Sequence, residues 1–317
     1  MSDVSKLRAE RQVLGIEIGG TKLQLVAGDE NDSITSRERL QVAPSEGGEG
    51  IRRQIEASLP RLIEREKPAA IGVGFGGPVD FETGAICCSH QIEGWNDFPL
   101  GQWLRDLTGL PVAVENDANT AALAEALVGA GREANPMCWV NMGSGVGGGL
   151  VVDGAIYHGA RPGEAEIGHL RLGRNGETVE SRCSGWAVDA RIRGLKDSAP
   201  DSVLCHLIGD QEGGEARHLA EALEKGDAAA KNILTETADD LAFGLSHVVQ
   251  LFHPEAIVMG GGLSLVGESL RKAVEAALSK YTMEAFAPGP SVRLAATGED
   301  SVTVGALLLA AKALEGS

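Results

Sequence analysis

Apolar residues in the first part of the chain form strand-like runs separated by helix-like segments. Residues 13–27 read "VLGIEIGGTKLQLVA", and branched apolar residues on both sides of "GGT" favour two strands joined by a glycine turn. "EGIRRQIEASLPRLIERE" then has helical periodicity, and "AAIGVGFGGPVD" predicts a buried strand that runs into a glycine–proline turn. "LGQWLRDLTG" predicts a short helix that ends at a glycine. "LPVAVENDANTAALAEALVGAG" predicts a strand, a polar turn and an alanine-rich helix, so this part of the chain is a mixed α/β layer.

The opening pattern returns in the second half of the chain. "CWVNMGSGVGGGLVVDG" again has an apolar strand, a turn of glycine and hydroxyl residues, and a second apolar strand. Further on, "GDAAAKNILTETADDLAFGLSHVVQLFHPEAIVMGGGLS" predicts a long helix, a strand and a triple-glycine turn, and "TVGALLLAAKAL" predicts a final apolar helix. We therefore expect two related α/β domains that face each other and are joined by short hinges.

Composition narrows the classes of function. The chain has 317 residues, 43 of them glycine, which is about twice the roughly 7% of average proteins and favours tight turns and close approach of backbone to ligand. A net charge of −17 argues against nucleic-acid binding. No apolar run reaches the ~18 residues of a membrane span, and the first residues lack the apolar core of a signal peptide. The five cysteines share no disulfide or metal spacing, so we expect a protein of the reducing cytoplasm.

The two glycine turns are candidates for phosphate binding. Backbone N–H groups in a tight turn form an anion-binding concavity, and the hydroxyls of Thr21 and Ser144 add donors. Either turn alone is as well explained as an ordinary hairpin. Both turns together with "MGGGLS" favour a nucleotide held at three places, although no Walker loop occurs and "GIEIGGTK" is not a "GxGxxG" motif.

Polar side chains follow the buried strand of "VENDANTAALAE". Asp117 could accept a proton from a substrate hydroxyl, and Asn116 could bind another hydroxyl. Helix capping explains the same two residue types, because Asn and Asp are preferred N-cap residues. "GEAEIGHLRL" also brings Glu166 close to His169, which fits a sugar-binding cleft. A solvated charge explains Glu166 equally well, and a hydrogen-bonded structural histidine explains His169.

The ordered set of motifs resembles the ROK family (repressors, open reading frames and sugar kinases). "GIEIGGTKLQ", "GFGGPVD", "ENDANTAALAEALVGAG", "MGSGVGGGLVVDGAIYHG", "EAEIGHL" and "IVMGGGLS" follow the order of that family over roughly residues 12–312. The resemblance implies two actin-like ATPase (ribonuclease H-like) α/β domains with a cleft between them. We expect a small domain of residues 1–116 plus 301–317 and a large domain of residues 117–300. The first strand begins almost at the start of the chain, which leaves no room for the DNA-binding segment of ROK repressors and favours the kinase branch.

The resemblance also implies roles for individual residues. Asp117 matches the catalytic base that deprotonates the sugar hydroxyl. The implied sugar-binding residues are Gly77, Gln91, Asn116, Glu166, His169 and Glu180, with Gln91 standing where the family usually has Asn. The implied residues for ATP and its phosphates are Glu17, Gly19, Gly20, Thr21, Lys22, Gly143, Ser144, Gly145, Gly260, Gly261 and Gly262.

Two departures from the family pattern change what we expect. The family often has a "CxCGxxGC" zinc loop, but "RLGRNGETVE" contains no cysteine and Cys183 comes too late, so we expect no structural zinc. Glu17 replaces the Asp whose carboxylate reaches the Mg²⁺ bound to the nucleotide. The extra methylene either substitutes for a bridging water or displaces the carboxylate by ~1 Å, which can cost ~100-fold in rate.

The resulting expectation is an ATP- and Mg²⁺-dependent kinase for a hexose, glucose first, that forms a homodimer in the cytoplasm and binds neither nucleic acid nor membrane. N-acetylmannosamine, N-acetylglucosamine, allose and fructose remain alternative substrates. A second alternative is a sugar-binding regulator with weak or lost catalysis.

Overall fold

A computed structural model describes residues 11–29, 33–89, 92–163 and 165–315 of the chain. The chain forms two compact units, and each contains a five-stranded sheet with helices, so the predicted α/β class is confirmed. Unit 1 consists of Met1–Ala124, Tyr157–Glu164 and Glu299–Ser317, and unit 2 of Glu125–Ile156 and Ala165–Gly298. These compact units are not the same division as the two predicted domains. The predicted domain boundaries after residues 116 and 300 therefore stay a prediction.

The sheet of unit 1 has the strand order β3-β2-β1-β4-β7. β2 is antiparallel to β1 and β3, whereas β4 is parallel to β1 and β7. Because β1, β4 and β7 are parallel, their carboxyl ends meet at one edge of the sheet, where α/β proteins place their ligands. The strands are β1 (Val13–Ile18), β2 (Lys22–Gly28), β3 (Ile34–Gln41), β4 (Ile71–Phe75) and β7 (Val112–Asn116), and a separate ribbon pairs β5 (Val79–Asp80) with β6 (Ala85–Ile86).

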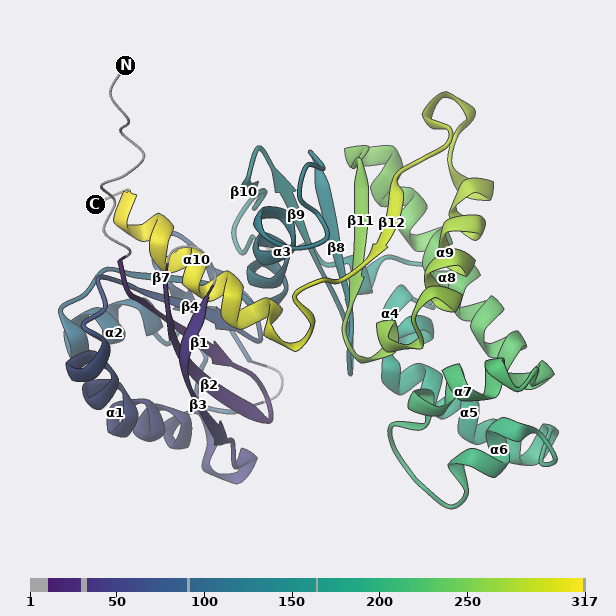
Figure 1. Cartoon of the computed structure of the whole chain (residues 1–317), viewed down its shortest axis with the longest axis horizontal. Coiled ribbons are helices and arrows are strands. Elements are labelled where there is room, and N and C mark those ends of the chain that lie inside the picture. Colours follow the sequence, from purple (N-terminus) through teal and green to yellow (C-terminus); the bar gives the residue numbers. More distant parts are fainter. Residues whose placement is uncertain (1–10, 30–32, 90–91, 164, 316–317) are drawn as a thin grey trace. The chain divides into compact units, whose positions relative to one another are not determined.

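Helices cover both faces of this sheet (Figure 1). On one face, α1 (Gly47–Glu66) and α2 (Leu100–Thr108) bury residues such as Ile55 against strand residues such as Ile16. α2 ends as predicted at Gly109, which is left-handed with φ +70°. On the other face α10 (Ser301–Glu315) lies directly on bare backbone, since a Cβ at Gly72 would be 1.9 Å from the oxygen of Ala306.

The sheet of unit 2 has the order β10-β9-β8-β11-β12 and repeats the pattern of unit 1. β9 is antiparallel to β8, and β11 is parallel to β8 and β12, so the second glycine hairpin predicted from the sequence is confirmed. The strands are β8 (Met137–Met142), β9 (Val146–Val152), β10 (Ala155–Ile156), β11 (Ala256–Gly260) and β12 (Ser291–Leu294).

The helices of unit 2 enclose its largest apolar core. They are α4 (Val179–Cys183), α5 (Gly185–Ser198), α6 (Val203–Ile208), α7 (Leu219–Glu224), α8 (Ala228–Phe252) and α9 (Glu268–Tyr281), and α3 (Asp117–Leu127) runs from unit 1 into unit 2. α8 is the long helix predicted from the sequence, and the side chain of Asp227 caps it by accepting from the nitrogens of Ala229 and Ala230. Within the described residues, no helix combines the length and apolar character needed to cross a membrane.

Candidate active site

The first glycine turn, Gly19–Thr21, lies at the carboxyl edge of β1. Its backbone is pinned where the nitrogen of Gly19 donates to the oxygen of Lys22 (3.0 Å). The nitrogen of Gly76, just beyond β4, donates to the oxygen of Ile18 (2.9 Å) and so holds the next turn beside it. Gly19 and Gly20 are half-buried and Thr21 is exposed, so the turn is open to an anion at this edge.

Asp117, the predicted base, lies beside the same turns. β7 ends at Asn116 and α3 begins at Asp117, whose Oδ1 accepts from the nitrogen of Ala118 (2.9 Å). A Cβ placed on Gly76 would lie 3.6 Å from Oδ2 of Asp117 and 3.7 Å from the Cα of Gly19. The fold of unit 1 therefore brings the predicted base and the predicted phosphate turn to either side of one glycine.

Asn116 caps α3. Its Oδ1 accepts from the nitrogens of Ala118 (2.8 Å) and Asn119 (3.2 Å), and its Nδ2 donates to the oxygen of Gly77 (3.1 Å). The capping explanation for this residue is therefore correct. An amide nitrogen carries two hydrogens, so the sugar-binding role implied by the family resemblance depends on the second hydrogen of Nδ2.

A buried carboxylate that sequence reasoning did not assign supports this helix start. Glu115 is 3% exposed, and its Oε1 accepts from the nitrogen of Asn116 (2.9 Å) and from Nδ2 of Asn119 (3.1 Å). Its Oε2 lies 2.5 Å from Nε2 of His158, whose ring stacks on Phe81. These contacts fasten the segment of residues 157–163 to unit 1. No local spacing could reveal the Glu115–His158 pair, because 43 positions separate its members.

Glu17 is buried and has partners for both carboxylate oxygens. It is 6% exposed, with Nζ of Lys22 2.8 Å from Oε1 and Nε2 of Gln24 donating to Oε2 at 2.6 Å. Burial of a carboxylate is costly unless it is paired and hydrogen-bonded, and the hairpin supplies both kinds of partner. This explains how an otherwise apolar strand carries a glutamate. The ammonium of Lys22, a residue predicted to bind phosphate, forms an ion pair with Glu17.

The second glycine turn, in unit 2, carries Glu180. The nitrogen of Val146 donates to Oε2 of Glu180 (2.9 Å), and a Cβ on Gly145 would lie only 2.5 Å from the same oxygen. At the start of the same turn, the nitrogen of Gly185 donates to the oxygen of Gly143 (2.7 Å). Glu180, predicted as a sugar ligand, thus lies directly against a predicted phosphate turn.

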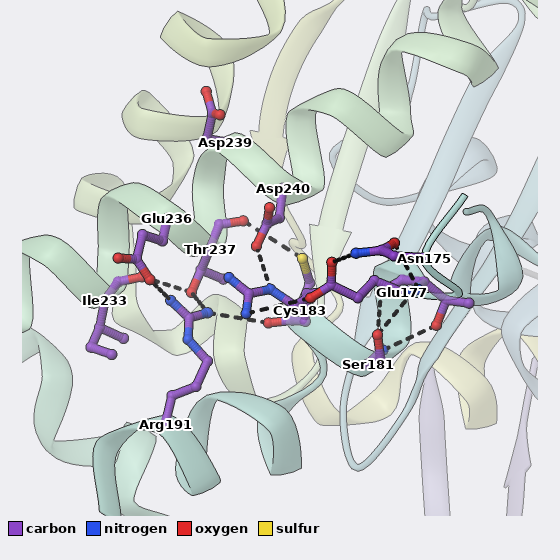
Figure 2. Close-up of polar contacts among 12 residues, drawn as sticks. Asn175, Glu177, Ser181, Cys183, Arg191, Ile233, Glu236, Thr237, Asp239 and Asp240 are labelled. Atoms are coloured by element: carbon purple, nitrogen blue, oxygen red, sulfur yellow. Dashed lines mark hydrogen bonds and ion pairs between the residues drawn. The ribbon is translucent and has the colours of Figure 1, made fainter. Parts of the chain in front are cut away.

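Polar contacts join α4, the helix of Glu180, to α8, and Figure 2 shows those around Cys183 and Asp240. Nε of Arg182 donates to Oδ2 of Asp240 (2.9 Å), and this hydrogen bond raises the pKa of Arg182 above its ordinary value. The thiol of Cys183 donates to the oxygen of Thr237 (3.6 Å), and burial raises its pKa to about 12. Two residues of the short helix that carries Glu180 are therefore tied to the long helix α8.

The third glycine turn is at the same edge of the unit 2 sheet. Gly260 packs under the ring of Trp139, since a Cβ there would be 1.9 Å from the indole. Gly261 has φ +81°, and a Cβ would lie 2.6 Å from Oδ1 of Asn141 and from the backbone of Met142. Only glycine fits this position, and the turn contacts the end of β8 from which the second turn begins.

The remaining predicted sugar-binding residues are less enclosed. The side chains of Glu166 and His169 are 55% and 73% exposed, and Nε2 of His169 is 3.9 Å from Oε2 of Glu166. Gln91 lies outside the described residues. The predicted sugar residues thus divide into one group in unit 1 and one in unit 2, and a single sugar site built from both groups stays a prediction.

Comparison with known proteins identifies the family. The pattern of the ROK family matches residues 13–313. The chain belongs to the ROK family. It is 32% identical to a glucokinase of Halalkalibacterium halodurans, over 94% of each chain. Its fold is similar to the crystal structure of a ROK family glucokinase from Streptomyces griseus in complex with glucose and AMPPNP, with a TM-score of 0.82 and 30% identity over 95% of this chain and 99% of that one. A ROK hexokinase from Thermus thermophilus gives a TM-score of 0.79 and 29% identity, over 96% of this chain and all of that one.

The residues of this ROK protein are compatible with Mg²⁺ delivered by a nucleotide. Within the described part of the chain, no three His, Cys, Asp or Glu side chains are grouped to hold a metal, so a cage made by protein alone is not present there. Mg²⁺ usually takes one or two carboxylates and keeps waters and phosphate oxygens as its other ligands. A carboxylate offers about four lone pairs, and two protein donors on Glu17 leave room for such a contact. The absence of structural zinc stays a prediction.

Proposed function

We propose that the protein is an ATP-dependent hexose kinase that phosphorylates the 6-hydroxyl of glucose, with Asp117 as the general base. The observation that carries the proposal is the similarity to glucokinases over almost the whole chain, including one bound to glucose and an ATP analogue. Further support comes from the Asp117 carboxylate beside Gly76 and the first glycine turn. The proposed cytoplasmic location and homodimer are extensions of the same similarity.

The proposed mechanism is in-line phosphoryl transfer, which needs positioning and charge stabilisation more than covalent chemistry. Asp117 takes the proton of the attacking hydroxyl, and its place at the start of α3 puts the carboxylate where a helix favours negative charge. Backbone N–H groups of the glycine turns hold the phosphates of ATP. Mg²⁺, when bound with the nucleotide, neutralises charge that develops on the transferred phosphoryl group. Glu17 is the residue that we assign to its coordination sphere.

A coupled assay of ADP release over a panel of sugars tests the reaction and the choice of substrate. We expect the highest kcat/KM with glucose. Faster turnover of N-acetylmannosamine, N-acetylglucosamine, allose or fructose would keep the kinase and change its substrate. Sugar binding without turnover of any sugar would instead favour the regulator and refute the kinase.

Replacement of the base tests the assigned mechanism. Asp117→Asn keeps the oxygen that accepts from the nitrogen of Ala118, so the variant should fold and bind sugar. The asparagine cannot accept a proton, so kcat should fall by several orders of magnitude. Loss of a general base alone typically costs ~10²–10⁴-fold in rate, and loss of substrate positioning would add to this. Turnover within tenfold of the parent protein would refute Asp117 as the base. Calorimetric binding of the sugar to both proteins is the control.

A further inference from the structure

Gln24 is a buried amide in the middle of the charged residues around Glu17. It stands directly opposite Glu17 in the β1–β2 pairing and is 2% exposed. Its Nε2 donates to Oε2 of Glu17 (2.6 Å). Its Oε1 accepts from Nη1 of Arg37 (3.1 Å) and from Nε of Arg39 (2.9 Å), both on β3. Every polar atom of this side chain therefore has a charged partner.

These contacts allow only one orientation of the amide. A guanidinium can donate and cannot accept, and an ionised carboxylate can accept and cannot donate. Turning the amide over would put its NH₂ group against Arg37 and Arg39 and its oxygen against Glu17, so all three hydrogen bonds would be lost. Arg37 is itself held, because its Nη1 donates to Oδ1 of Asp300 (2.7 Å) just before α10.

Hydrogen bonds to ions are stronger and more directional than neutral ones, so the fixed amide also fixes the carboxylate that it contacts. Lys22 reaches the other oxygen of Glu17 from an exposed position and contributes a flexible point charge. Gln24, in contrast, gives the carboxylate a directional hydrogen bond from a buried position.

We propose that Gln24 is a positioning residue that holds the Glu17 carboxylate in one orientation toward the nucleotide site, with Arg37 and Arg39 fixing Gln24 in turn. The consequence for catalysis rests on the proposed kinase function. The orientation itself depends only on contacts within unit 1.

The decisive variant is Gln24→Glu. It keeps an oxygen acceptor for Arg37 and Arg39 but replaces the donor to Glu17 by a second carboxylate. Val26→Ala is the control, because Val26 is a buried residue of the same strand and face that packs on Gly15 away from Glu17. We expect kcat of Gln24→Glu to fall about 10- to 100-fold, with KM for the sugar changed less than about twofold, as for a small misplacement of a catalytic group. A kcat within about threefold of the parent, or a loss matched by Val26→Ala, would overturn the proposal.

Two further measurements separate this proposal from the proposed function. Calorimetry gives the affinity for ATP with and without Mg²⁺, and the tightening by Mg²⁺ should shrink about tenfold in Gln24→Glu and in Glu17→Gln alike. An unchanged ratio in Gln24→Glu overturns the positioning role even if no sugar is phosphorylated. Hydrogen exchange of the Gln24 side-chain amide, followed by NMR in the parent and in Glu17→Ala, tests the contact without nucleotide. Equal exchange rates in the two proteins would also overturn it.

Discussion

A methyl group added at Gly76 should leave the fold intact and abolish most of the activity. Gly76 lies outside the left-handed region, and its new Cβ would meet the oxygen of Ile18 at 3.4 Å, Oδ2 of Asp117 at 3.6 Å and the Cα of Gly19 at 3.7 Å. These are ordinary van der Waals distances. Replacement of glycine by alanine at a compatible position stabilises a protein by about 0.4–1 kcal/mol through the unfolded chain. Gly76→Ala should therefore unfold at the same denaturant concentration as the parent or a slightly higher one.

The same methyl group occupies the space between the proposed base and the proposed phosphate turn. A substrate hydroxyl must come within about 2.6–3.2 Å of the Asp117 carboxylate to lose its proton. A displacement of ~1 Å can cost ~100-fold in rate, which corresponds to about 2.7 kcal/mol of lost transition-state stabilisation. We expect kcat/KM of Gly76→Ala to fall at least about 100-fold.

Two other glycines of this strand region serve as controls because they face α10 instead. A Cβ on Gly74 would lie 2.5 Å from Cγ1 of Val302, and one on Gly72 would lie 1.9 Å from the backbone oxygen of Ala306. Overpacking of this kind costs about 1–3 kcal/mol where a side chain can yield, as at Gly74, and more where backbone must move, as at Gly72. Along the series from 72 to 74 to 76, the loss of stability should shrink.

Urea unfolding and steady-state kinetics on the three alanine variants test this reasoning. The loss of activity per folded molecule should be largest at Gly76, where the loss of stability is smallest. Turnover by Gly76→Ala within about threefold of the parent would refute a substrate that approaches Asp117 from the Gly76 side. Strong destabilisation of the same variant would refute the packing assigned to this turn.

Three further predictions follow from described contacts. Burial raises the pKa of Cys183 to about 12, so only ~10⁻⁴ of this thiol should be thiolate at pH 8, and iodoacetamide should not label it in the native protein. Peptide mass mapping measures the labelling, and a rate as fast as in urea would contradict the burial of Cys183. The hydrogen bond from Arg37 holds the pKa of Asp300 below its ordinary value, so this carboxylate stabilises the fold above about pH 4 and loses its effect as pH falls below that. The difference in urea midpoint between Asp300→Asn and the parent should accordingly shrink in acid, and a difference that grows there would contradict the pairing. His158→Ala removes the imidazole that contacts the buried Glu115 carboxylate and should lower the free energy of unfolding by about 1–3 kcal/mol. His158→Gln should recover part of this loss. A loss below about 0.5 kcal/mol in His158→Ala would show that the fold does not need the pair.

Hydrophobic periodicity and glycine turns were sufficient to predict both hairpins and the long helix α8. Each of these elements has its own apolar periodicity or is bounded by turn residues in the sequence. The stretch of residues 185–224 gave no such signal, yet it forms α5, α6 and α7. These helices are short, turn residues interrupt them, and apolar residues such as Ile192 and Leu204 are explained by their burial in the core of unit 2. Tertiary contact decided their structure.

The residues of the candidate site also divide into those that the sequence indicates and those that it does not. Asp117 could be found because it stands where a strand gives way to a helix, and Glu17 because a carboxylate in an apolar run is conspicuous. The partners of Glu17 on β2 are only a few positions away, and strand pairing could have indicated them. Arg37, His158 and the contact of Glu180 with the second turn join residues far apart in sequence. Such contacts depend on the register of whole elements, which one sequence does not reveal.

The place of α10 in unit 1 has a consequence for how the chain folds during synthesis. The strands of unit 1 are made first, but the face that carries Gly15 and Gly72 can be covered only by α10, which is made after every element of unit 2. All of unit 2 is complete once Gly298 has been added. We therefore expect unit 1, although its strands are made first, to reach its native structure no earlier than unit 2, in contrast to the usual N-terminal-first order. Until α10 arrives, the half-finished sheet offers an apolar face that a chaperone could bind.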